Sequence, residues 1–480
     1  MFAMVALAAS AQMRGQCSNS WLPVGADHYV RAMTTWDPDG AGPQTAVVVV
    51  GGQFTMIGGI PANGIAIHDP VLGTWSAMGT PQLANVRSIA VMANGDLIAC
   101  GDLGTSSLLA RWNGSSWAPF ATGMSGAAGP LLPLPNGDLI VGGSPIVLGG
   151  TGVAGVARWN GASWSPMPGL GAFSSLGMGV LALAVTSSGD IVAGGMFSCS
   201  GGENLARWNG AGWTSINPFP PIPSVAFDPV FALAPLPNDG LVAAAHFGGV
   251  MQRNGATWSQ LVGGVPVSFY SSMSVASNGD VVAGDVSLGL VRWNGSAWST
   301  FPNGLAGFPH AFANGPNGDL WVGGNFITAG GLASPNLARV TTSCPASVAT
   351  YGSGCAGTGG LNVLSAVTLP WIDSTFRARA VGMPQLALVL SVYGFTTQSI
   401  PFASVFPQGL PGCTILMNGD LIDVLLPSAG VVDTQIALPD LPALAGRAFH
   451  HYVVPFEVDL ALSITAITNS NALTCTVGAF

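Results

Sequence analysis

The stretch Ala110-Arg111-Trp112-Asn113-Gly114-Ser115-Ser116-Trp117 recurs along this chain of 480 residues. Close copies begin at Ala157, Ala206 and Val291, and a degenerate copy begins at Gln252. Counted from the final tryptophan of each unit, the spacing is 40 to 54 residues. Such a period indicates one supersecondary unit stacked many times, because a single unit cannot bury its own apolar face. The number of units therefore decides the fold.

A second motif precedes the first in most units: an apolar run that ends in two glycines, as in residues 139–143 and 191–195. This run occurs seven times when degenerate copies are counted. Most copies follow a tight polar turn such as Asn136-Gly137-Asp138, which favours a hairpin because Asn and Gly accept positive φ. The sequence therefore predicts seven units, each made of four short strands.

Short strands at regular spacing, without a long helical period, predict an all-β chain. Radial packing of four-stranded sheets hides most strand edges. We therefore predict a seven-bladed β-propeller over residues 21–341. Trp21 has no unit before it, whereas the last unit ends at Val340 without its final tryptophan. The segment around Trp21 is thus expected to supply the outer strand of the last blade and close the ring.

The combined pattern resembles kelch-type β-propellers, whose repeats carry an apolar run, a glycine pair and two spaced aromatic residues. Trp112 stands where kelch repeats usually carry tyrosine, and Trp117 stands at their tryptophan. The form Gly-Gly-x-Phe-x-x-x-Gly-Gly followed by Asn-x-Ala-Arg-Trp-Asn-Gly, over residues 194–210, is similar to the secreted bacterial variety. The resemblance covers residues 21–341 and implies a propeller. It implies no single function, because propellers host adhesins, signalling platforms and enzymes alike.

Composition excludes several functional classes. The chain has twelve arginines and no lysine, which excludes a P-loop, a pyridoxal Schiff base and a lysine nucleophile. A net charge of −9 without basic clusters argues against nucleic acid or an anionic membrane as a partner. The mean hydropathy is +0.51, yet no run of 18 apolar residues occurs. This apolarity therefore indicates buried strands and not a membrane span.

Residues 1–11 are typical of the end of a secretory signal peptide. Residues 2–9 are apolar, and Ala9-Ser10-Ala11 is a small-x-small cleavage site, although the usual positive n-region is missing. The alternative is a short N-terminal strand of a cytosolic protein. We predict that the protein is secreted, either free or at the cell surface.

The repeat ends near Val340, and residues 342–480 are expected to form a second domain. Period-two alternation over residues 386–392, 414–426 and 458–467 predicts a small antiparallel β-sandwich. The opening Tyr351-Gly352-Ser353-Gly354-Cys355 and parts of residues 470–478 are similar to the accessory β-domain that often follows repeats in large secreted bacterial proteins. This resemblance implies no known chemistry.

Four of the seven cysteines lie in this second domain. On an exported chain an even number of cysteines in one small module favours disulfides. Of the three possible connectivities we favour Cys344 with Cys475 and Cys355 with Cys413. Zinc ligation is the competing interpretation, but the spacings lack a Cys-x-x-Cys knuckle. The remaining three, which are left unassigned, are Cys17, Cys100 and Cys199.

The repeated arginines allow two interpretations, an anion-binding ring or structural partners for the turn carboxylates. Six units carry both an arginine and a turn aspartate, and antiparallel neighbours bring the start of one strand beside the end of the next. We therefore favour pairing within each blade. The predicted pairs are Asp96 with Arg111, Asp138 with Arg158, Asp190 with Arg207, Asp280 with Arg292, and Asp319 with Arg339. The sixth such unit carries Asp239 and Arg253.

The two faces of the predicted propeller differ. The Asn-Gly-Asp and Asn-Gly turns are uniform and share one face, whereas the connections after the glycine pair and after the final tryptophan vary in length and share the other. Regular scaffolds usually place recognition in their irregular loops. We therefore predict a binding surface on the second face. Its candidate residues, which mix aromatic and polar side chains, are Phe219, Asp228, His246, Phe269, Tyr270, Phe308 and His310.

These candidates do not make a set of nucleophile, base and acid, so no catalytic residue is predicted. No metal site or cofactor is predicted either. Glycoside hydrolysis needs two paired carboxyls, and Asp37-Pro38-Asp39-Gly40 is better explained as a turn. We predict a secreted, non-catalytic binding protein whose partner is a protein or a glycan. The alternative is an extracellular carbohydrate-active or oxidative enzyme built on a propeller.

Overall fold

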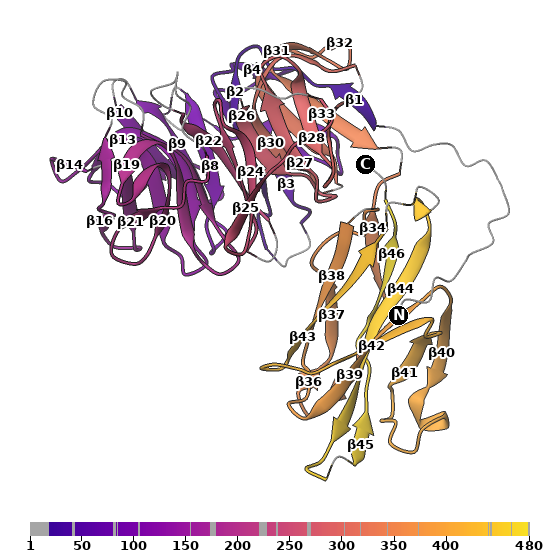
Figure 1. The fold of residues 1–480 in the computed structure, drawn as a ribbon. Coiled ribbons are helices and arrows are strands. Elements are labelled where there is room, and N and C mark those ends of the chain that lie inside the picture. Colours follow the sequence, from indigo (N-terminus) through magenta and orange to yellow (C-terminus); the bar gives the residue numbers. More distant parts are fainter. Residues whose placement is uncertain are drawn as a thin grey trace. The chain divides into compact units, whose positions relative to one another are not determined.

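The computed structural model describes residues 19–478 with short gaps (Figure 1). The gaps are residues 41–43, 80–82, 84, 104–105, 154, 173–178, 220–227, 237–238, 266–269, 302, 317, 343, 373, 440, 442–443 and 462. The predicted signal peptide, Cys17 and Phe269 lie outside the described residues. The chain divides into two compact units, residues 20–341 and a unit that contains residues 342–480. Each unit is described by itself.

Regular structure in the described residues is almost entirely β. The exception is one 3-10 turn, η1 (Phe402–Ser404). No described helix has the length and apolar character that crossing a membrane requires. The predicted all-β class is confirmed.

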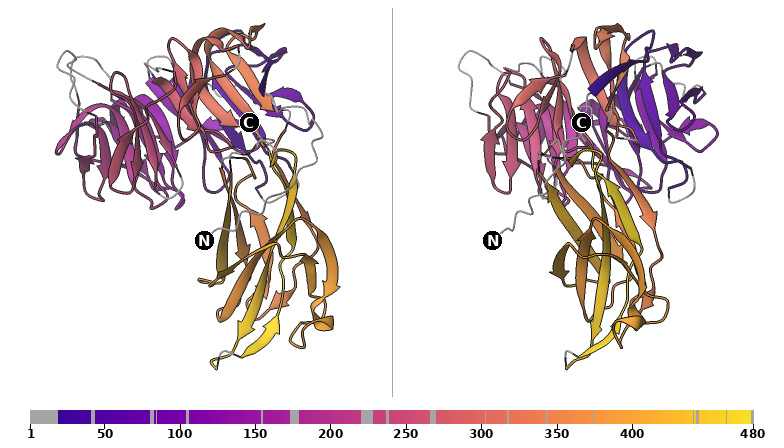
Figure 2. Two further views of the ribbon diagram at one scale, coloured as in Figure 1. Left: turned by 45° about the vertical axis from the view of Figure 1, so that its right-hand side comes forward. Right: turned by 90° about the vertical axis from the view of Figure 1, so that its right-hand side faces the viewer.

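The first unit contains seven antiparallel sheets that follow one another around it (Figure 2). From the innermost strand outward, the first sheet contains β2 (Val30–Trp36), β3 (Val47–Gly52), β6 (Ile65–Asp69) and β7 (Thr74–Ala77), and the second contains β8 (Val86–Val91), β9 (Leu97–Leu103), β10 (Ser106–Trp112) and β11 (Trp117–Pro119). The third contains β12 (Met124–Pro133), β13 (Leu139–Leu148), β15 (Val156–Trp159) and β16 (Trp164–Pro166), and the fourth contains β18 (Val180–Val185), β19 (Ile191–Cys199), β20 (Gly202–Trp208) and β21 (Trp213–Ser215).

The remaining three sheets are β22 (Val230–Pro235), β23 (Leu241–Ala245), β24 (Gly249–Asn254) and β25 (Thr257–Gln260); β26 (Tyr270–Val275), β27 (Val281–Asp285), β28 (Gly289–Trp293) and β29 (Trp298–Thr300); and β30 (Leu305–Asn314), β31 (Leu320–Ala329), β33 (Leu337–Thr342) and β1 (Asn19–Pro23). Short extra strands are β4 (Met56–Ile57), β5 (Ile60–Pro61), β14 (Thr151–Val153), β17 (Leu170–Ala172) and β32 (Leu332–Ala333).

The ring is closed. Each innermost strand contacts the next one, from β2 through β8, β12, β18, β22 and β26 to β30, and β30 contacts β2. The outer strand of the seventh blade is β1, which pairs with β33 (Figure 1). Beyond it, the Gly25 amide donates to the Leu337 carbonyl at 2.9 Å, and the Val24 amide donates to Ser334 Oγ at 3.1 Å. The predicted N-terminal closing strand is confirmed.

Close packing between blades explains the glycine pair. A Cβ on Gly194 would lie 2.8 Å from Cγ1 of Val230, which belongs to the innermost strand of the next blade. A Cβ on Gly195 would overlap the carbonyl oxygen of Gly179. Neither glycine has a positive φ, so the pair is needed for space and not for backbone freedom. The same packing occurs at Gly51 and Gly52, Gly142 and Gly143, and Gly323 and Gly324.

The final tryptophan of a unit joins its blade to the previous one. Trp117 Nε1 donates to the Met78 carbonyl at 2.8 Å, and Trp164 Nε1 donates to the Ala121 carbonyl at 2.8 Å. Trp213 and Trp298 make the equivalent bonds to the blade before them. The repeated tryptophans therefore pack and hydrogen-bond within the ring, as large amphipathic rings do when buried.

The second unit is an antiparallel sandwich with an added hairpin. Its larger sheet has the order β34, β46, β44, β39, β42, with β45 beside β44, and its smaller sheet has the order β37, β38, β43. The strands are β34 (Ser347–Tyr351), β35 (Ala356–Gly357), β36 (Gly360–Leu361), β37 (Val363–Ala366), β38 (Ser374–Val381), β39 (Ala387–Gly394), β40 (Thr397–Pro401), β41 (Thr414–Met417), β42 (Leu421–Leu425), β43 (Val431–Leu438), β44 (Ala448–Val458), β45 (Ile464–Ile467) and β46 (Ala472–Thr476).

Two apolar clusters hold this unit together. The first lies between the sheets and includes Phe376, Val389 and Phe449. The second lies between the larger sheet and the β40–β41 hairpin and includes Phe402 and Tyr452. The larger sheet is therefore covered on both of its faces over part of its area.

The cysteine pairing was predicted correctly in one case and wrongly in the other. Cys355 and Cys413 form a disulfide. Cys475 is a free, buried thiol, whereas Cys344 is disulfide-bonded, so the predicted Cys344–Cys475 bond is wrong. The register explains why. β34 pairs Val348 with Cys475, so Cys344 lies four residues before the position opposite that thiol. Four residues of extended chain span about 13 Å, which is too far for a disulfide.

Candidate functional site

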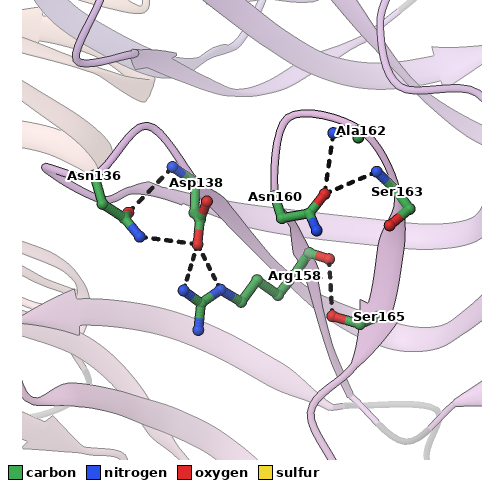
Figure 3. Close-up of polar contacts among 7 residues, drawn as sticks. All are labelled: Asn136, Asp138, Arg158, Asn160, Ala162, Ser163 and Ser165. Atoms are coloured by element: carbon green, nitrogen blue, oxygen red, sulfur yellow. Dashed lines mark hydrogen bonds and ion pairs between the residues drawn. The ribbon is translucent and has the colours of Figure 1, made fainter.

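The repeated polar residues are engaged with one another inside each blade. Arg158 Nε donates to Asp138 Oδ2 at 2.6 Å, and Asn136 Nδ2 donates to the same oxygen at 3.0 Å (Figure 3). On the following turn, Asn160 Oδ1 accepts the amides of Ala162 and Ser163. These bonds stabilise the Asn-Gly-Asp and Asn-Gly turns, so the repeated polar residues have a structural role.

All five predicted ion pairs are present. The shortest nitrogen–oxygen distances outside the Asp138 pair are 2.8 Å for Asp96 with Arg111, 2.9 Å for Asp190 with Arg207, 3.6 Å for Asp280 with Arg292, and 3.3 Å for Asp319 with Arg339. The aspartate is the more buried partner in each pair. These arginines therefore face carboxylates of their own blades.

The fifth blade departs from this pattern. Arg253 Nε donates to the Gly255 carbonyl at 2.8 Å, and the Asp239 carboxylate accepts from Ser187. The register gives the reason, because Gln252 pairs with Val242 at the position that arginine holds in the other blades. A shift of one residue along a strand sends the side chain to the opposite face.

An irregularity recurs at one place in every blade. The pairing between the first and second strands shifts register opposite the glycine pair, which leaves an unpaired bulge residue on the innermost strand. We call these positions the bulge ring. It consists of Arg31, Arg87, residues 129–130, Leu181, Phe231, residues 271–272 and His310.

The bulge ring lies on the predicted binding face. The bulge is near the start of the innermost strand in five blades and in the middle of the longer strands β12 and β30, and from each bulge the strand runs to the Asn-Gly-Asp turn or its counterpart at the other end. The ring therefore belongs to the end with the irregular connections. Sequence analysis placed only His310 of this ring among its candidates. The others could have been found by asking which residue stands opposite each glycine pair.

Three candidates come together in the fifth blade. The Phe247 amide donates to Asp228 Oδ1 at 2.7 Å. A Cβ on Gly248 would lie 2.7 Å from both Asp228 Oδ2 and the Phe219 ring, so these two side chains approach the same backbone. Burial lowers the pKa of His246, although the Asp228 carboxylate acts in the opposite direction.

The local role of this group is mainly packing. Phe219 is buried in the apolar cluster between the fourth and fifth blades. The ring of His246 lies 5.5 Å from that of Phe231, a bulge residue. This group thus packs against the bulge ring at Phe231.

A second group, which we call the seam cluster, lies where the seventh blade meets the first. It consists of Tyr29, Arg31, Phe308 and His310. Arg31 Cζ is 5.6 Å from the centre of the Tyr29 ring, and both Phe308 and Arg31 are exposed. Burial lowers the pKa of His310, and the positive charge of Arg31 lowers it further. His310 is therefore a neutral imidazole at neutral pH.

The last candidates lie between these groups in sequence. Tyr270 begins β26, where its backbone pairs with Asp285. Phe269 lies outside the described residues. The structure thus brings three candidates together beside the fifth blade and places two on β30 of the seventh blade, whereas Tyr270 belongs to neither group.

Two bulge arginines in neighbouring blades differ in their surroundings. Arg87 Nη2 lies 2.8 Å from Asp102 Oδ1, and Asn85 Nδ2 donates to the same carboxylate. Arg31 has neither an ion pair nor a hydrogen bond from its side chain among the described residues. Among the residues that the structure describes, its guanidinium contacts the Tyr29 ring alone, which leaves its five N–H donors free for a ligand.

No group of three or more His, Cys, Asp or Glu side chains that could hold a metal occurs in the part of the chain that the structure describes. A hollow of about 190 Å³ lies over the smaller sheet of the second unit, where Val367, Arg377 and Gln435 are among its lining residues. It is far in sequence from every predicted site residue.

No family model and no curated protein matches the chain. Solved structures resemble it at low identity. A streptogramin B lyase is 12% identical with a TM-score of 0.46, over 69% of this chain and 100% of that one. The extracellular domain of a hybrid two-component system from B. thetaiotaomicron is 9% identical with a TM-score of 0.45, over 97% and 60%. The WD40 β-propeller domain of Doa1 is 15% identical with a TM-score of 0.40, over 67% and 96%. At these values the likenesses assign no family and no function to this chain.

Proposed function

We propose that this chain is a non-catalytic binding protein whose propeller presents the bulge ring and the adjoining loops to a protein or a glycan. One observation carries this proposal: the bulge position recurs in every blade but carries side chains of different chemistry. Two arginines, a leucine, a phenylalanine and a histidine occupy it in five of the blades.

The contrast with the repeated residues supports this assignment. Arginine, aspartate and tryptophan of the repeats bond to one another or to the neighbouring blade, so their chemistry is used within the scaffold. The bulge recurs in the backbone of every blade, opposite Gly194-Gly195 in the fourth and opposite Ala244-Ala245 in the fifth, but its side chain changes. A constant backbone that carries variable side chains is the usual design of a recognition surface.

The chemistry of the face suits recognition. It combines aromatic rings, neutral imidazoles and one unpaired guanidinium, a mixture that is common in binding sites. We also propose that the protein is exported. The Cys355–Cys413 disulfide supports this, because such bonds persist in oxidising compartments. We further propose that the propeller is kelch-like and of the secreted bacterial type.

Paired variants on the two faces test the function. The full chain would be screened on arrays of glycans and of extracellular proteins, followed by analysis of any hit for chemical change. Phe308→Arg places a bulky charge on the bulge-ring face. Ala162→Arg places the same group on the turn that follows Asn160 (Figure 3), where Ala162 is exposed. We expect only Phe308→Arg to abolish binding. Loss with Ala162→Arg alone, or turnover of the bound molecule, would contradict the proposal.

A further inference from the structure

Arg31 is an unusual cation for this protein. Among the eight arginines of the propeller that the structure describes, six form ion pairs with aspartate and Arg253 donates to a carbonyl. Arg31 is exposed and has no such partner, in a chain whose net charge is −9. An unpaired arginine in an acidic protein without lysine is a specific point of attraction for an anion.

The surroundings hold this cation in place. The Tyr29 ring lies under the guanidinium at 5.6 Å, and the exposed His28 ring is 4.3 Å from Tyr29. Stacking on an aromatic ring restrains the arginine while it leaves the in-plane N–H donors open. The guanidinium is therefore oriented before a ligand arrives.

The neighbouring blade adds groups of a different kind. His310 occupies the same bulge position as Arg31 one blade earlier in the ring, and the two blades touch through Val30 and Gly323. A neutral imidazole offers one donor and one acceptor, which matches a hydroxyl group. Phe308, at 39% exposure, offers an apolar surface beside it.

We infer that the seam cluster binds an acidic sugar, with Arg31 pairing with a carboxylate or sulfate, His310 bonding to a hydroxyl, and Tyr29 and Phe308 contacting the apolar faces of the ring. This inference rests on the proposed binding function and names its ligand class. The apolar faces of a sugar ring match the aromatic surfaces of Tyr29 and Phe308, and the hydroxyls of the same ring can pair with a neutral imidazole. An acidic peptide is the competing outcome of the test.

The next blade provides a matched control. Arg111 is also exposed, but it lies outside the bulge ring, near the turn, where Asp96 neutralises it. Arg31→Gln and Arg111→Gln thus remove one positive charge each from the propeller. Only the first removes an unpaired guanidinium.

Titration calorimetry on the full chain tests this inference. The probes are an oligomer of galacturonic acid, a sulfated dextran oligomer, neutral dextran and pentaglutamate. We expect one or both acidic sugars to bind, with weaker binding at higher salt. Arg31→Gln should weaken binding by about 10- to 100-fold, Arg31→Lys should weaken it less, and Arg111→Gln should leave it unchanged. The carboxylated and sulfated probes show which anion is preferred.

Several results would overturn the inference. These are equal binding of neutral dextran, binding of pentaglutamate alone, an unaltered affinity in Arg31→Gln, or no binding of either acidic sugar. If another ligand from the arrays then bound and was lost in Phe308→Arg, the proposed function would stand without the acidic sugar. If ligands responded only to Ala162→Arg, the proposed function itself would fail.

Discussion

Cγ1 of Val30 in the first blade fills the space that a side chain on Gly323 in the seventh blade would need. Val230 and Gly194 are related in the same way at a joint inside the ring. The joint between the last and the first blade is therefore built like the others, although its two residues come from opposite ends of the repeat region. Ring closure uses ordinary blade packing in addition to the shared strand.

We expect Gly323→Ala to destabilise the propeller by about 1 to 3 kcal/mol, because the added methyl group overpacks this joint. Gly152→Ala is the control, since nothing lies within 4 Å of its Cβ position. Urea unfolding, followed by tryptophan fluorescence, measures both. Equal midpoints for the two variants would show that the joint tolerates a side chain.

Trp21→Ala should lower the free energy of unfolding by about 3 to 5 kcal/mol. Trp21 is 7% exposed, and its ring packs edge-on against Phe301 of the sixth blade at 6.2 Å. Leu72→Ala, at a residue that is 71% exposed, should have little effect. Calorimetric melting of the full chain distinguishes them, and a Trp21→Ala melt like that of the wild type would refute closure by β1.

Asp138→Asn should destabilise the third blade by about 1 to 3 kcal/mol without a change in ligand affinity. The Asp138 side chain is 10% exposed and accepts hydrogen bonds from Asn136 and Arg158. Asp433→Asn breaks an ion pair with Arg379 whose side chains are about 60% exposed, so it should cost less than about 1 kcal/mol. Weaker ligand binding at unchanged stability in Asp138→Asn would instead support the anion-ring interpretation.

The second unit should lose stability in mild acid. Burial lowers the pKa of His451 to about 4, whereas the unfolded value is about 6.5. The unfolded chain therefore takes up a proton in this window and the folded chain does not, so the free energy of unfolding falls as pH drops from about 6.5 to about 4, by about 3 kcal/mol. Above pH 6.5 this contribution is fully present.

Two measurements check the pH effect. The C2 proton of His451 should show no NMR titration between pH 7 and 5, and His451→Gln should flatten the pH dependence of the urea midpoint. His28→Gln, at an exposed position, serves as the control. A His451 resonance that titrates near pH 6.5 would contradict the assignment of a buried neutral imidazole held by Thr434 and Val392.

The repeated residues made most of the fold predictable. Gly194 and Trp117 signal blade packing by their spacing, and the absence of a tryptophan after Val340 pointed to Trp21 as the closing residue. Each of these residues contacts its own or the adjacent blade. Their positions in sequence therefore translate directly into positions in space.

The errors arose where register mattered. Arg253 directly precedes Asn254-Gly255, where the other repeats carry tryptophan, so it takes the strand position of Trp112 in the second blade and misses Asp239. The place of Cys475 at the end of the domain favours a bond to Cys344, but the strand register puts Cys475 opposite Val348. Arg31 was overlooked because a bulge becomes visible only once two strands are aligned.

The pairing of β1 with β33 has a consequence for biosynthesis. Val24 and Ser334, which bond at this joint, are 310 residues apart. At about 5 to 20 residues per second, the strand made first waits roughly 15 to 60 seconds for its neighbour to leave the ribosome. Six blades can form locally during that time, but the nascent chain carries an unmatched N-terminal edge throughout, so a prematurely terminated polypeptide would be prone to aggregate through it.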